Sequence, residues 1–370
     1  MTTHTSLSTI EQEQRAYLEA LVAEMQLFFD EQGELMAEVS AETLPILDAI
    51  QKLSTGGKRL RALLAYWGFR GAGGQADDPI IIKAGLAIEL FQSAALIHDD
   101  IIDASDTRRG APSVHRQFEA THRQQGFKTS PEAYGVSSAI LTGDMCLSWS
   151  EMAFSSIPQA GAHSEARHIF NLMRTEVMAG QYLDIVSEVV HVENPQVALE
   201  RALNVIRYKA AKYTCEQPLA LGGALGLGTA HGEPSPLIDH YRTFALPLGE
   251  GFQMRDDELG VFGEPEVTGK PAGDDLREGK RTVLTAYTAM LANSADHDFL
   301  ESSLGNQQLT LTDIARLQEL IRVSGALDAV EQLIEEKSQQ ALGALATLQV
   351  SEHVRTALEA IAAKALKRSA

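Results

Sequence analysis

The chain has little cysteine, few aromatic residues and no surplus of basic charge. Only Cys146 and Cys215 occur among its 370 residues, so a disulfide framework is excluded and a reducing cytoplasm is the expected compartment. Lys and Arg number 31 against 50 Asp and Glu, giving a formal net charge of −19. This balance argues against a generally basic nucleic-acid-binding protein. An anionic substrate would therefore need a local group of cations or a bound metal ion.

The sequence also lacks the usual signs of a membrane protein. Its apolar runs are interrupted by charged residues or Gly well short of the ~20 residues that a membrane-spanning helix needs. The first residues, MTTHTSLSTIEQEQ, contain no basic region followed by an apolar one. The composition, 44% hydrophobic and 22% charged, is that of an ordinary globular protein. We therefore expect a globular protein with no transmembrane segment.

Helical periodicity dominates the chain, and the alternation typical of strands is absent. Apolar residues recur at spacings of three and four in the segments 12–29, 59–70, 80–102, 137–155, 164–189, 196–228, 237–260, 282–293, 312–324, 327–347 and 352–367. The Gly- and Pro-rich stretches between them are too short to be domain linkers. The pattern predicts an all-α fold in which residues 1–370 form a single large helical bundle, with residues 1–50 as an N-terminal helical extension.

An acidic cluster ends the apolar segment 84–98. Asp99 and Asp103 are four residues apart, so their carboxylates lie on one face of a helix and repel each other. One interpretation is a solvated helix end, and the other is a divalent-cation site. The apolar neighbours Ile97 and Ile101 favour the cation site. Mg²⁺ takes carboxylate oxygens and shares its remaining positions with water and substrate phosphates.

A second acidic cluster, Asp256–Asp257–Glu258, lies in GFQMRDDELG (251–260) and ends another largely apolar stretch. Two acidic helix ends that face one cavity would hold metal ions on opposite walls. Basic residues are concentrated near the clusters and after Gly56–Gly57, namely Lys58, Arg59, Arg61, Arg108, Arg109, Lys270, Lys280 and Arg281. Arg binds phosphate oxygens in pairs and Lys adds a point charge, so this placement predicts phosphate groups bridged by metal.

Taken together, these motifs resemble the trans-isoprenyl diphosphate synthases, also called polyprenyl synthetases. The matching segments follow the family's order: GGKRLR (56–61), LIHDDIIDASDTRRG (96–110), LTGD (141–144), MAGQYLDI (178–185), RYKAAKYT (207–214), GFQMRDDELGVFGEP (251–265), TGKPAGDDL (268–276) and REGKRT (277–282). The last three are most similar to actinobacterial short-chain members that make geranylgeranyl or farnesyl diphosphate. The resemblance implies an isoprenoid synthase bundle with a central active-site cavity, usually in a homodimer.

The resemblance also implies a Mg²⁺-dependent prenyl transfer from an allylic diphosphate to isopentenyl diphosphate. Three Mg²⁺ ions would be held by Asp99, Asp103 and Asp256, with Asp100 and Asp257 assisting. The allylic diphosphate would be held by Arg108, Lys209, Lys270 and Lys280. Isopentenyl diphosphate would be held without metal by Gly57, Lys58, Arg61, Arg109 and Gln92. Lys209 and Gln253 would stabilise the carbocation. Gln181 and Asp184 would line the cavity near the metals or, alternatively, join two helices.

Product length would depend on the helix that precedes the first cluster. Ala94 and Ala95 are small and leave room below Asp99, whereas Phe91 lies one turn deeper on roughly the same face. Phe91 is either the floor of the product cavity or ordinary core packing. Met145, Leu147 and Trp149 are other candidates for the floor. A floor at Phe91 favours the C20 product geranylgeranyl diphosphate, with farnesyl and longer products as alternatives.

Two residues depart from the pattern implied by the resemblance. Gly260 replaces the last acid of the second cluster, and Ala210 replaces the Thr that usually follows the catalytic Lys. Two other functions would use the same bundle. A terpene cyclase would use a second motif that Asp256, Gly260 and Glu264 nearly match, but it has no need for the basic group after Gly57. A non-catalytic regulatory subunit usually loses one cluster or the basic group, and this chain keeps both.

Overall fold

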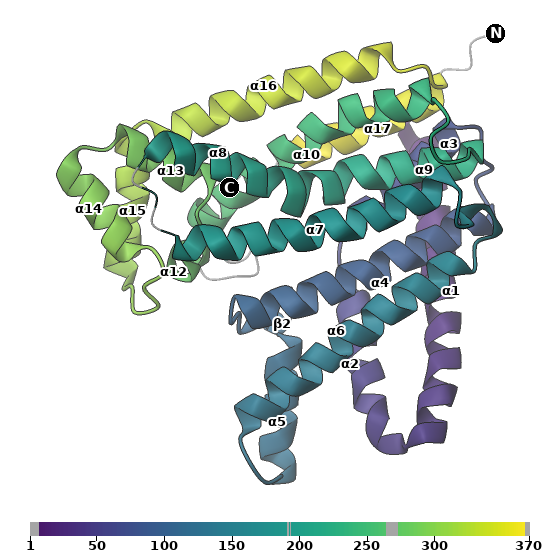
Figure 1. Cartoon of the computed structure of the whole chain (residues 1–370), viewed down its shortest axis with the longest axis horizontal. Helices are drawn as coiled ribbons and strands as arrows, with labels where there is room; N and C mark the ends of the chain where they lie inside the picture. Colours follow the sequence, from purple (N-terminus) through teal and green to yellow (C-terminus); the bar gives the residue numbers. More distant parts are fainter. Residues whose placement is uncertain (1–6, 191, 193, 264–272, 367–370) are drawn as a thin grey trace. The chain divides into compact units, whose positions relative to one another are not determined.

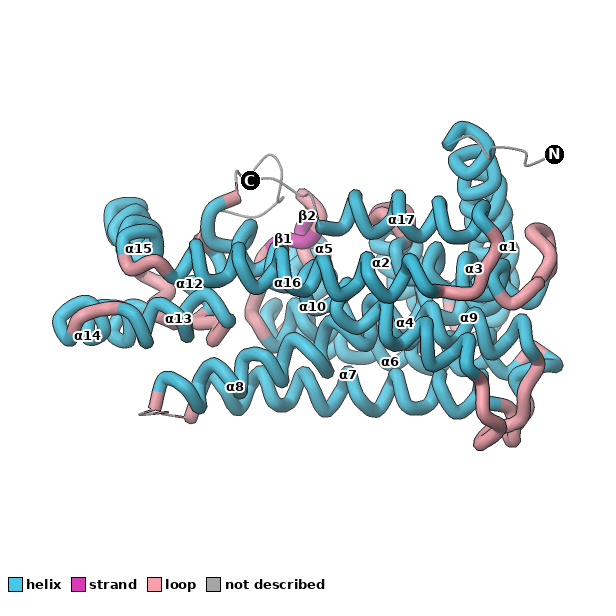
Figure 2. Tube along the Cα trace, turned by 90° about the horizontal axis from the view of Figure 1, so that it is seen from above, coloured by secondary structure: helices cyan, strands magenta, loops and turns pink. Residues whose placement is uncertain are grey.

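The computed structural model describes residues 7–190, 192, 194–263 and 273–366 (Figure 1). Within these residues helices make up nearly all of the regular structure, and β1 and β2 form a single two-stranded antiparallel sheet (Figure 2). The prediction of an all-α fold is confirmed. The chain groups into two compact units, each built from two stretches of sequence.

The elements follow one another without long connections. They are α1 (Leu7–Val39), η1 (Ala41–Thr43), α2 (Leu44–Ser54), α3 (Leu60–Gly71), α4 (Pro79–Ile102), β1 (Thr107–Arg108), β2 (Ala111–Pro112), α5 (Val114–Gln125), α6 (Pro131–Ser155), η2 (Pro158–Ala160), α7 (Glu165–Val189), α8 (Pro195–Val205), η3 (Ile206–Glu216), α9 (Gln217–Leu227), α10 (Pro236–Phe262), α12 (Asp274–Glu278), α13 (Val283–Leu291), α14 (Ser294–Ser303), α15 (Leu311–Val323), α16 (Ala326–Thr347) and α17 (Glu352–Leu366).

Unit 1 comprises residues up to Arg167 together with 221–233. Its central helix is α4, which packs along α6 and also contacts α1 and α3. Asp78 caps α4 by accepting a hydrogen bond from the Ile80 amide, and Pro79 occupies the first helical turn, as a helix start requires. The Ser150 hydroxyl of α6 donates to the Ala87 carbonyl of α4 at 2.6 Å, which ties the two long helices together.

The apolar character of α4 exceeds what the sequence analysis expected. It is the one described helix long and apolar enough to cross a membrane, with a mean hydropathy of 1.8 over 18 residues. Lys83 and Glu89 are too few charges to break the run, so the expectation that every apolar run stops short was wrong. Sixty-seven per cent of this window is buried inside the protein. The helix is therefore a buried core helix.

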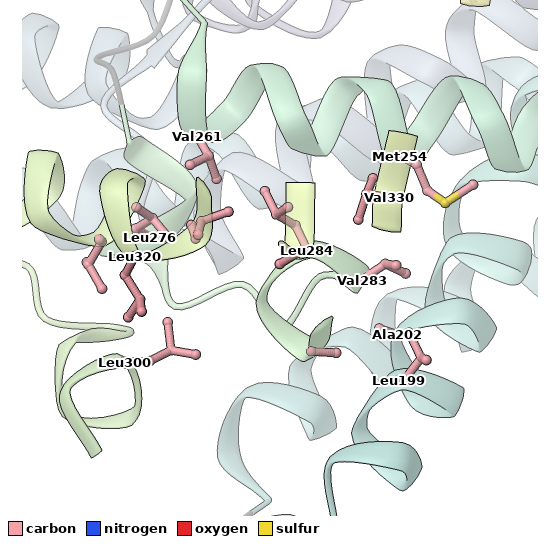
Figure 3. Close-up of a cluster of buried hydrophobic side chains, with 14 of the residues drawn as sticks. Leu199, Ala202, Met254, Val261, Leu276, Val283, Leu284, Leu300, Leu320 and Val330 are labelled. Carbon is pink, nitrogen blue, oxygen red and sulfur yellow. The ribbon is translucent and has the colours of Figure 1, made fainter. Parts of the chain in front are cut away.

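Unit 2 comprises residues 168–220 and those from Pro234 onward. Its long helix α10 packs on η3 and α16, and α13 packs on α8 and α16. Buried aliphatic side chains from these helices and from α12, α14 and α15 form one cluster, which includes Leu199, Val261, Leu284 and Leu300 (Figure 3). This cluster fixes the end of α10 that carries the second acidic motif.

The expected helix 196–228 is present but is not uniform. It comprises α8, an eleven-residue π-helix η3, and α9. A Cβ added at Gly249 of α10 would lie 2.6 Å from the Ala211 carbonyl oxygen of η3, so glycine permits a close approach of the two backbones. The π-helix contains Lys209, and π-helical turns are frequent at functional sites. Its sequence carries no periodicity that distinguishes it from an α-helix.

Candidate functional site

The first acidic cluster lies at the C-terminal end of α4 in unit 1. Asp103 is the C-cap residue, and its amide donates to the Asp99 carbonyl at 2.8 Å. Asp100 is buried, whereas Asp99 and Asp103 are half-buried. The helix therefore places three carboxylates within its last turn, as predicted.

Arg108 offsets the repulsion among these carboxylates. Its Nε donates to Asp100 Oδ1 at 2.8 Å, and its Nη2 lies 3.5 Å from Asp99 Oδ2. Burial would lower the pKa of Arg108, but the charge and hydrogen bonds of Asp100 outweigh this effect and raise it. The predicted ligand of the allylic diphosphate is thus held against the carboxylates that are predicted to bind metal.

A tight hairpin brings Arg108 to this position. Arg108 ends β1, Ala111 begins β2, and the two-residue loop between them consists of Arg109 and Gly110. Both loop residues have positive φ, 56° and 74°, as a type I′ hairpin turn requires. The turn points two consecutive arginines to different partners.

Arg109 contacts the glycine-rich loop between α2 and α3. Its Nη1 donates to the carbonyls of Leu53 at 2.7 Å and Gly56 at 2.9 Å. A Cβ at Gly57, where φ is 97°, would lie 2.8 Å from Arg109 Nη2. The structure therefore brings Gly57 and Arg109 together, although they are 52 positions apart in the sequence. Lys58 in the same loop is exposed, and Arg61 is half-buried at the start of α3.

The other predicted residues of unit 1 lie on α4. Gln92 and Ala95 are half-buried, whereas Phe91 and Ala94 are buried. The burial of Phe91 agrees equally with a cavity floor and with core packing. Trp149, another candidate for the floor, packs its ring edge-on against Phe28 of α1, with the ring centroids 5.7 Å apart.

Lys209 of η3 is paired with Asp184 of α7 in unit 2. Lys209 Nζ lies 2.5 Å from Asp184 Oδ2. The two helices can approach because Gly180 has no side chain: a Cβ there would lie 2.4 Å from the Lys209 amide nitrogen. Of the two roles expected for Asp184, the link between helices is present. Gln181 is half-buried on the same helix.

The second acidic cluster lies near the C-terminal end of α10. The Gln253 amide donates to Asp257 Oδ1 at 2.8 Å. Burial raises the pKa of Asp257 to about 7, and the neighbouring charges of Asp275 and Asp256 raise it further against the lowering effects of Gln253 and Lys280. In the metal-free protein this carboxyl group is thus partly protonated near neutral pH.

Asp275 is a functional candidate that the sequence analysis missed. It lies in α12, and its Oδ2 would be 1.8 Å from a Cβ at Gly260. Asp275 Oδ1 is 3.4 Å from Lys280 Nζ, which also pairs with Glu278 at 2.7 Å. The carboxylate of Asp275 thus fills the room left by the missing acid at position 260. The acidic pair directly before the REGKRT segment was the available signal.

The oxygen donors of both clusters are of the type that Mg²⁺ prefers, so the donor sets fit this ion. Among the described residues, no group of three or more His, Cys, Asp or Glu side chains has metal-binding geometry by itself. Predicted ligand Lys270 lies outside the described residues. The first cluster belongs to unit 1 and the second to unit 2, and their meeting at one cavity stays a prediction.

Comparison with known proteins identifies the family. The model of the polyprenyl synthetase family matches residues 45–321. The chain belongs to this family. It is a prenyltransferase of the polyprenyl diphosphate synthase class with the isoprenoid synthase fold. The family match thus confirms the resemblance inferred from the sequence motifs.

Several polyprenyl synthetases are similar to this chain over most of its length. A geranylfarnesyl diphosphate synthase of Aeropyrum pernix is 30% identical over 76% of this chain and 81% of the relative. A geranylgeranyl diphosphate synthase of Saccharolobus solfataricus is 30% identical over 73% and 74%. A crystal structure of geranylgeranyl pyrophosphate synthase from Corynebacterium glutamicum, complexed with isoprenyl diphosphate and magnesium, is 38% identical. It has a TM-score of 0.88 and covers 95% of this chain and 99% of its own.

Proposed function

We propose that this polyprenyl synthetase condenses isopentenyl diphosphate with allylic diphosphates and that its main product is geranylgeranyl diphosphate. The contact of Arg109 with Gly56 and Gly57 carries the proposal, because it gathers cations at a loop that contains no carboxylate. A second diphosphate can bind there without metal. A terpene cyclase has no second diphosphate and gains nothing from this group.

The residues of the chain divide the chemistry between them. Asp99, Asp103 and Asp256 would hold Mg²⁺, with Asp100 and Asp257 assisting, and three ions are expected with a bound diphosphate. When bound, Mg²⁺ stabilises the negative charge of the leaving diphosphate. Arg108, Lys209, Lys270 and Lys280 would orient that diphosphate as the allylic C–O bond breaks. Lys58, Arg61, Arg109 and Gln92 would orient isopentenyl diphosphate.

Carbon–carbon bond formation needs no dedicated protein base. The double bond of isopentenyl diphosphate attacks the allylic cation, and the proton then lost passes to the released diphosphate. The amide of Gln253 and the backbone near Lys209 present dipoles that stabilise the cation. The hydrogen bond from Gln253 to Asp257 holds the amide in one orientation. Water must be excluded during this step because it would quench the cation.

The proposed C20 product rests on α4 and on the relatives. Ala94 and Ala95 leave space below the first cluster, and Phe91 one turn deeper would close it. The Corynebacterium glutamicum structure described above is of a geranylgeranyl pyrophosphate synthase and has isoprenyl diphosphate and magnesium bound. The Aeropyrum pernix relative makes a longer product by its name, so a longer chain is the main alternative.

We further propose a cytoplasmic homodimer in which residues 1–370 form a single isoprenoid synthase domain. Apolar side chains on α6 remain exposed in the single chain, among them Ile140, Leu141 and Met152. Such exposed groups are typical of surfaces that a partner covers. A second copy of the chain is the partner that the family resemblance implies.

Product analysis tests the proposed function directly. Purified protein is incubated with Mg²⁺, labelled isopentenyl diphosphate and each of the dimethylallyl, geranyl and farnesyl diphosphates, and the products are sized. A C20 diphosphate supports the proposal, and Phe91→Ala should then lengthen the product. A cyclic hydrocarbon made without isopentenyl diphosphate would indicate a cyclase. No turnover with any primer would indicate a regulatory subunit.

A further inference from the structure

A buried carboxylate lies beside the glycine-rich loop and belongs to neither acidic cluster. Glu89 is in the middle of α4 and is 8% exposed. An ionised carboxylate loses its hydration on burial, so it needs a cationic partner in the interior. Burial raises the pKa of Glu89, while the charges of Arg59, Arg61 and Arg109 lower it. Three guanidinium groups therefore act on a single buried carboxylate.

Arg59 is the direct partner of Glu89. Arg59 Nη1 lies 3.3 Å from Glu89 Oε2 and 3.2 Å from Met25 Sδ, and Nη2 donates to the Ser54 carbonyl at 2.9 Å. One guanidinium thus joins α1, the end of α2 and α4. These contacts direct the side chain of Arg59 into the interior of unit 1.

The backbone of Arg59 sets the direction of its basic neighbours. Its φ is 49°, in the left-handed region that non-glycine residues rarely adopt, and it is the N-cap residue of α3. Lys58 precedes this turn and Arg61 follows it. Such a conformation persists only where surrounding contacts hold it, and the contacts of the Arg59 side chain are of this kind.

We propose that Glu89 is a positioning residue for isopentenyl diphosphate: by pairing with Arg59 it fixes the left-handed turn that presents Lys58 and Arg61, beside Arg109, to the diphosphate. This inference rests on the proposed function. Glu89 touches no substrate in this account and acts only through Arg59. It therefore controls the metal-free diphosphate and leaves the allylic diphosphate unaffected.

A purely structural role for Glu89 makes a different prediction. The loss of a buried ion pair would lower the stability of unit 1 but would not alter the affinity for one diphosphate selectively. The decisive readout is therefore the Michaelis constant for isopentenyl diphosphate compared with that for the allylic substrate. Binding of isopentenyl diphosphate in EDTA, measured by calorimetry, adds a readout that does not depend on turnover.

The experiment uses the full chain with Glu89→Gln, Arg59→Lys and the double variant. We expect Glu89→Gln to raise both the KM and the EDTA dissociation constant for isopentenyl diphosphate roughly tenfold, with the allylic KM and kcat changed less than about twofold. Arg59→Lys keeps the charge but loses the fork that contacts Glu89 and Ser54 together, so it should show the same selective pattern. The double variant should be no weaker than Glu89→Gln.

Glu151→Gln is the matched control. Glu151 pairs with Arg167 at 2.6 Å in the same unit, and its replacement should leave both KM values unchanged. Unchanged affinity for isopentenyl diphosphate, tighter binding of it, or an equal rise in both KM values would overturn the inference. If Glu89→Gln does not fold, Arg59→Lys decides by the same criteria. A wild-type protein that neither binds nor incorporates isopentenyl diphosphate would instead refute the proposed function.

Discussion

At the scale of single residues, Gly260 is the departure with the clearest structural explanation. Its missing side chain leaves room that the Asp275 carboxylate occupies, and that carboxylate is also close to Lys280. The second cluster has thus kept a third acidic group near it by using a residue from α12. Because the room is already filled, an acid at position 260 would not simply be added to the cluster.

Gly260→Asp should therefore destabilise the protein and reduce its activity. A Cβ at this position would lie 1.8 Å from Asp275 Oδ2, and the new charge would repel both Asp275 and Asp257. We expect the free energy of unfolding to fall by about 2 kcal/mol, the usual cost of inserting atoms into a packed site. Chemical denaturation without Mg²⁺ measures this change, and kcat measured across Mg²⁺ concentrations measures the effect on activity.

Gly343→Asp is the control for this substitution. Gly343 lies in α16 with no atom within 4 Å of its added Cβ, so the same chemical change meets open space. Its unfolding free energy should stay within about 0.5 kcal/mol of the wild type. A Gly260→Asp protein that is as stable as this control and more active than the wild type would contradict our account of Asp275.

Glu216 predicts a pH dependence of stability. It is buried in η3, which raises its pKa above the ordinary value of 4.5, and its Oε2 accepts no hydrogen bond from the described residues. Lys212, the nearest cation acting on it, is already paired with Glu176. A carboxyl group with a raised folded-state pKa favours the folded state below its unfolded pKa and loses that contribution as pH rises through the folded-state value.

Glu216→Gln should consequently stabilise the protein at pH 8, because the amide stays neutral where the carboxylate is charged. We expect a gain of about 1 kcal/mol, the size of the desolvation cost of an unsatisfied buried group. Urea titrations at several pH values between 4 and 8 measure it. The gain should vanish toward pH 4, and a gain independent of pH would show that burial of charge is not the cause.

At the scale of secondary-structure elements, the close approach of α7 and η3 positions Lys209. Gly180→Ala should push these helices apart, because its Cβ would lie 2.4 Å from the Lys209 amide nitrogen. We expect a loss of about 2 kcal/mol in stability and a lower kcat, since the pairing of Lys209 with Asp184 would lengthen. Denaturation and steady-state kinetics measure the two effects.

Gly343→Ala provides the comparison for Gly180→Ala. It should leave kcat unchanged and, because alanine favours a helix interior more than glycine does, raise stability slightly. If Gly180→Ala behaved in the same way, the two backbones would be able to separate without cost to the site.

Periodicity predicted the long helices well and the short polar ones poorly. The apolar spacing of α4, α6 and α10 marks their buried faces, whereas α5 presents only Val114 and Phe118 among polar residues and gave little signal. The π-helical winding of η3 depends on the approach of Gly249 to Ala211, which is a tertiary contact that local sequence does not encode.

The site was predictable where a motif is continuous and was missed where partners are distant in sequence. The stacked carboxylates of α4 follow from spacing alone. The pairing of Arg108 with Asp100 depends on a hairpin with positive φ at Arg109, and that of Arg59 with Glu89 joins residues 30 positions apart. Asp275 escaped notice because its role depends on the empty space at Gly260.

At the scale of the whole molecule, the proposed homodimer gives a prediction about α6. Leu141 is 59% exposed, and Leu141→Lys should shift the protein from dimer to monomer because a charge would be buried at the interface. Light scattering coupled to size exclusion measures the mass. Leu311→Lys on α15, where the native side chain is 77% exposed, is the control and should leave the mass unchanged. A wild-type monomer, or a dimer unaffected by Leu141→Lys, would refute this assignment.

Unit 1 is assembled from two separate stretches of the chain, and this has a consequence for biosynthesis. Residues 221–233 return to it after a long excursion, and a Cβ at Gly222 of α9 would lie 1.8 Å from the Ala65 carbonyl oxygen of α3. A ribosome that has made only the first 167 residues has thus not yet supplied the last piece of this unit. The nascent chain must wait with part of its apolar interior uncovered until translation has passed Glu233. Chaperones have this interval in which to act, and a fragment cut between the units would retain neither of them whole.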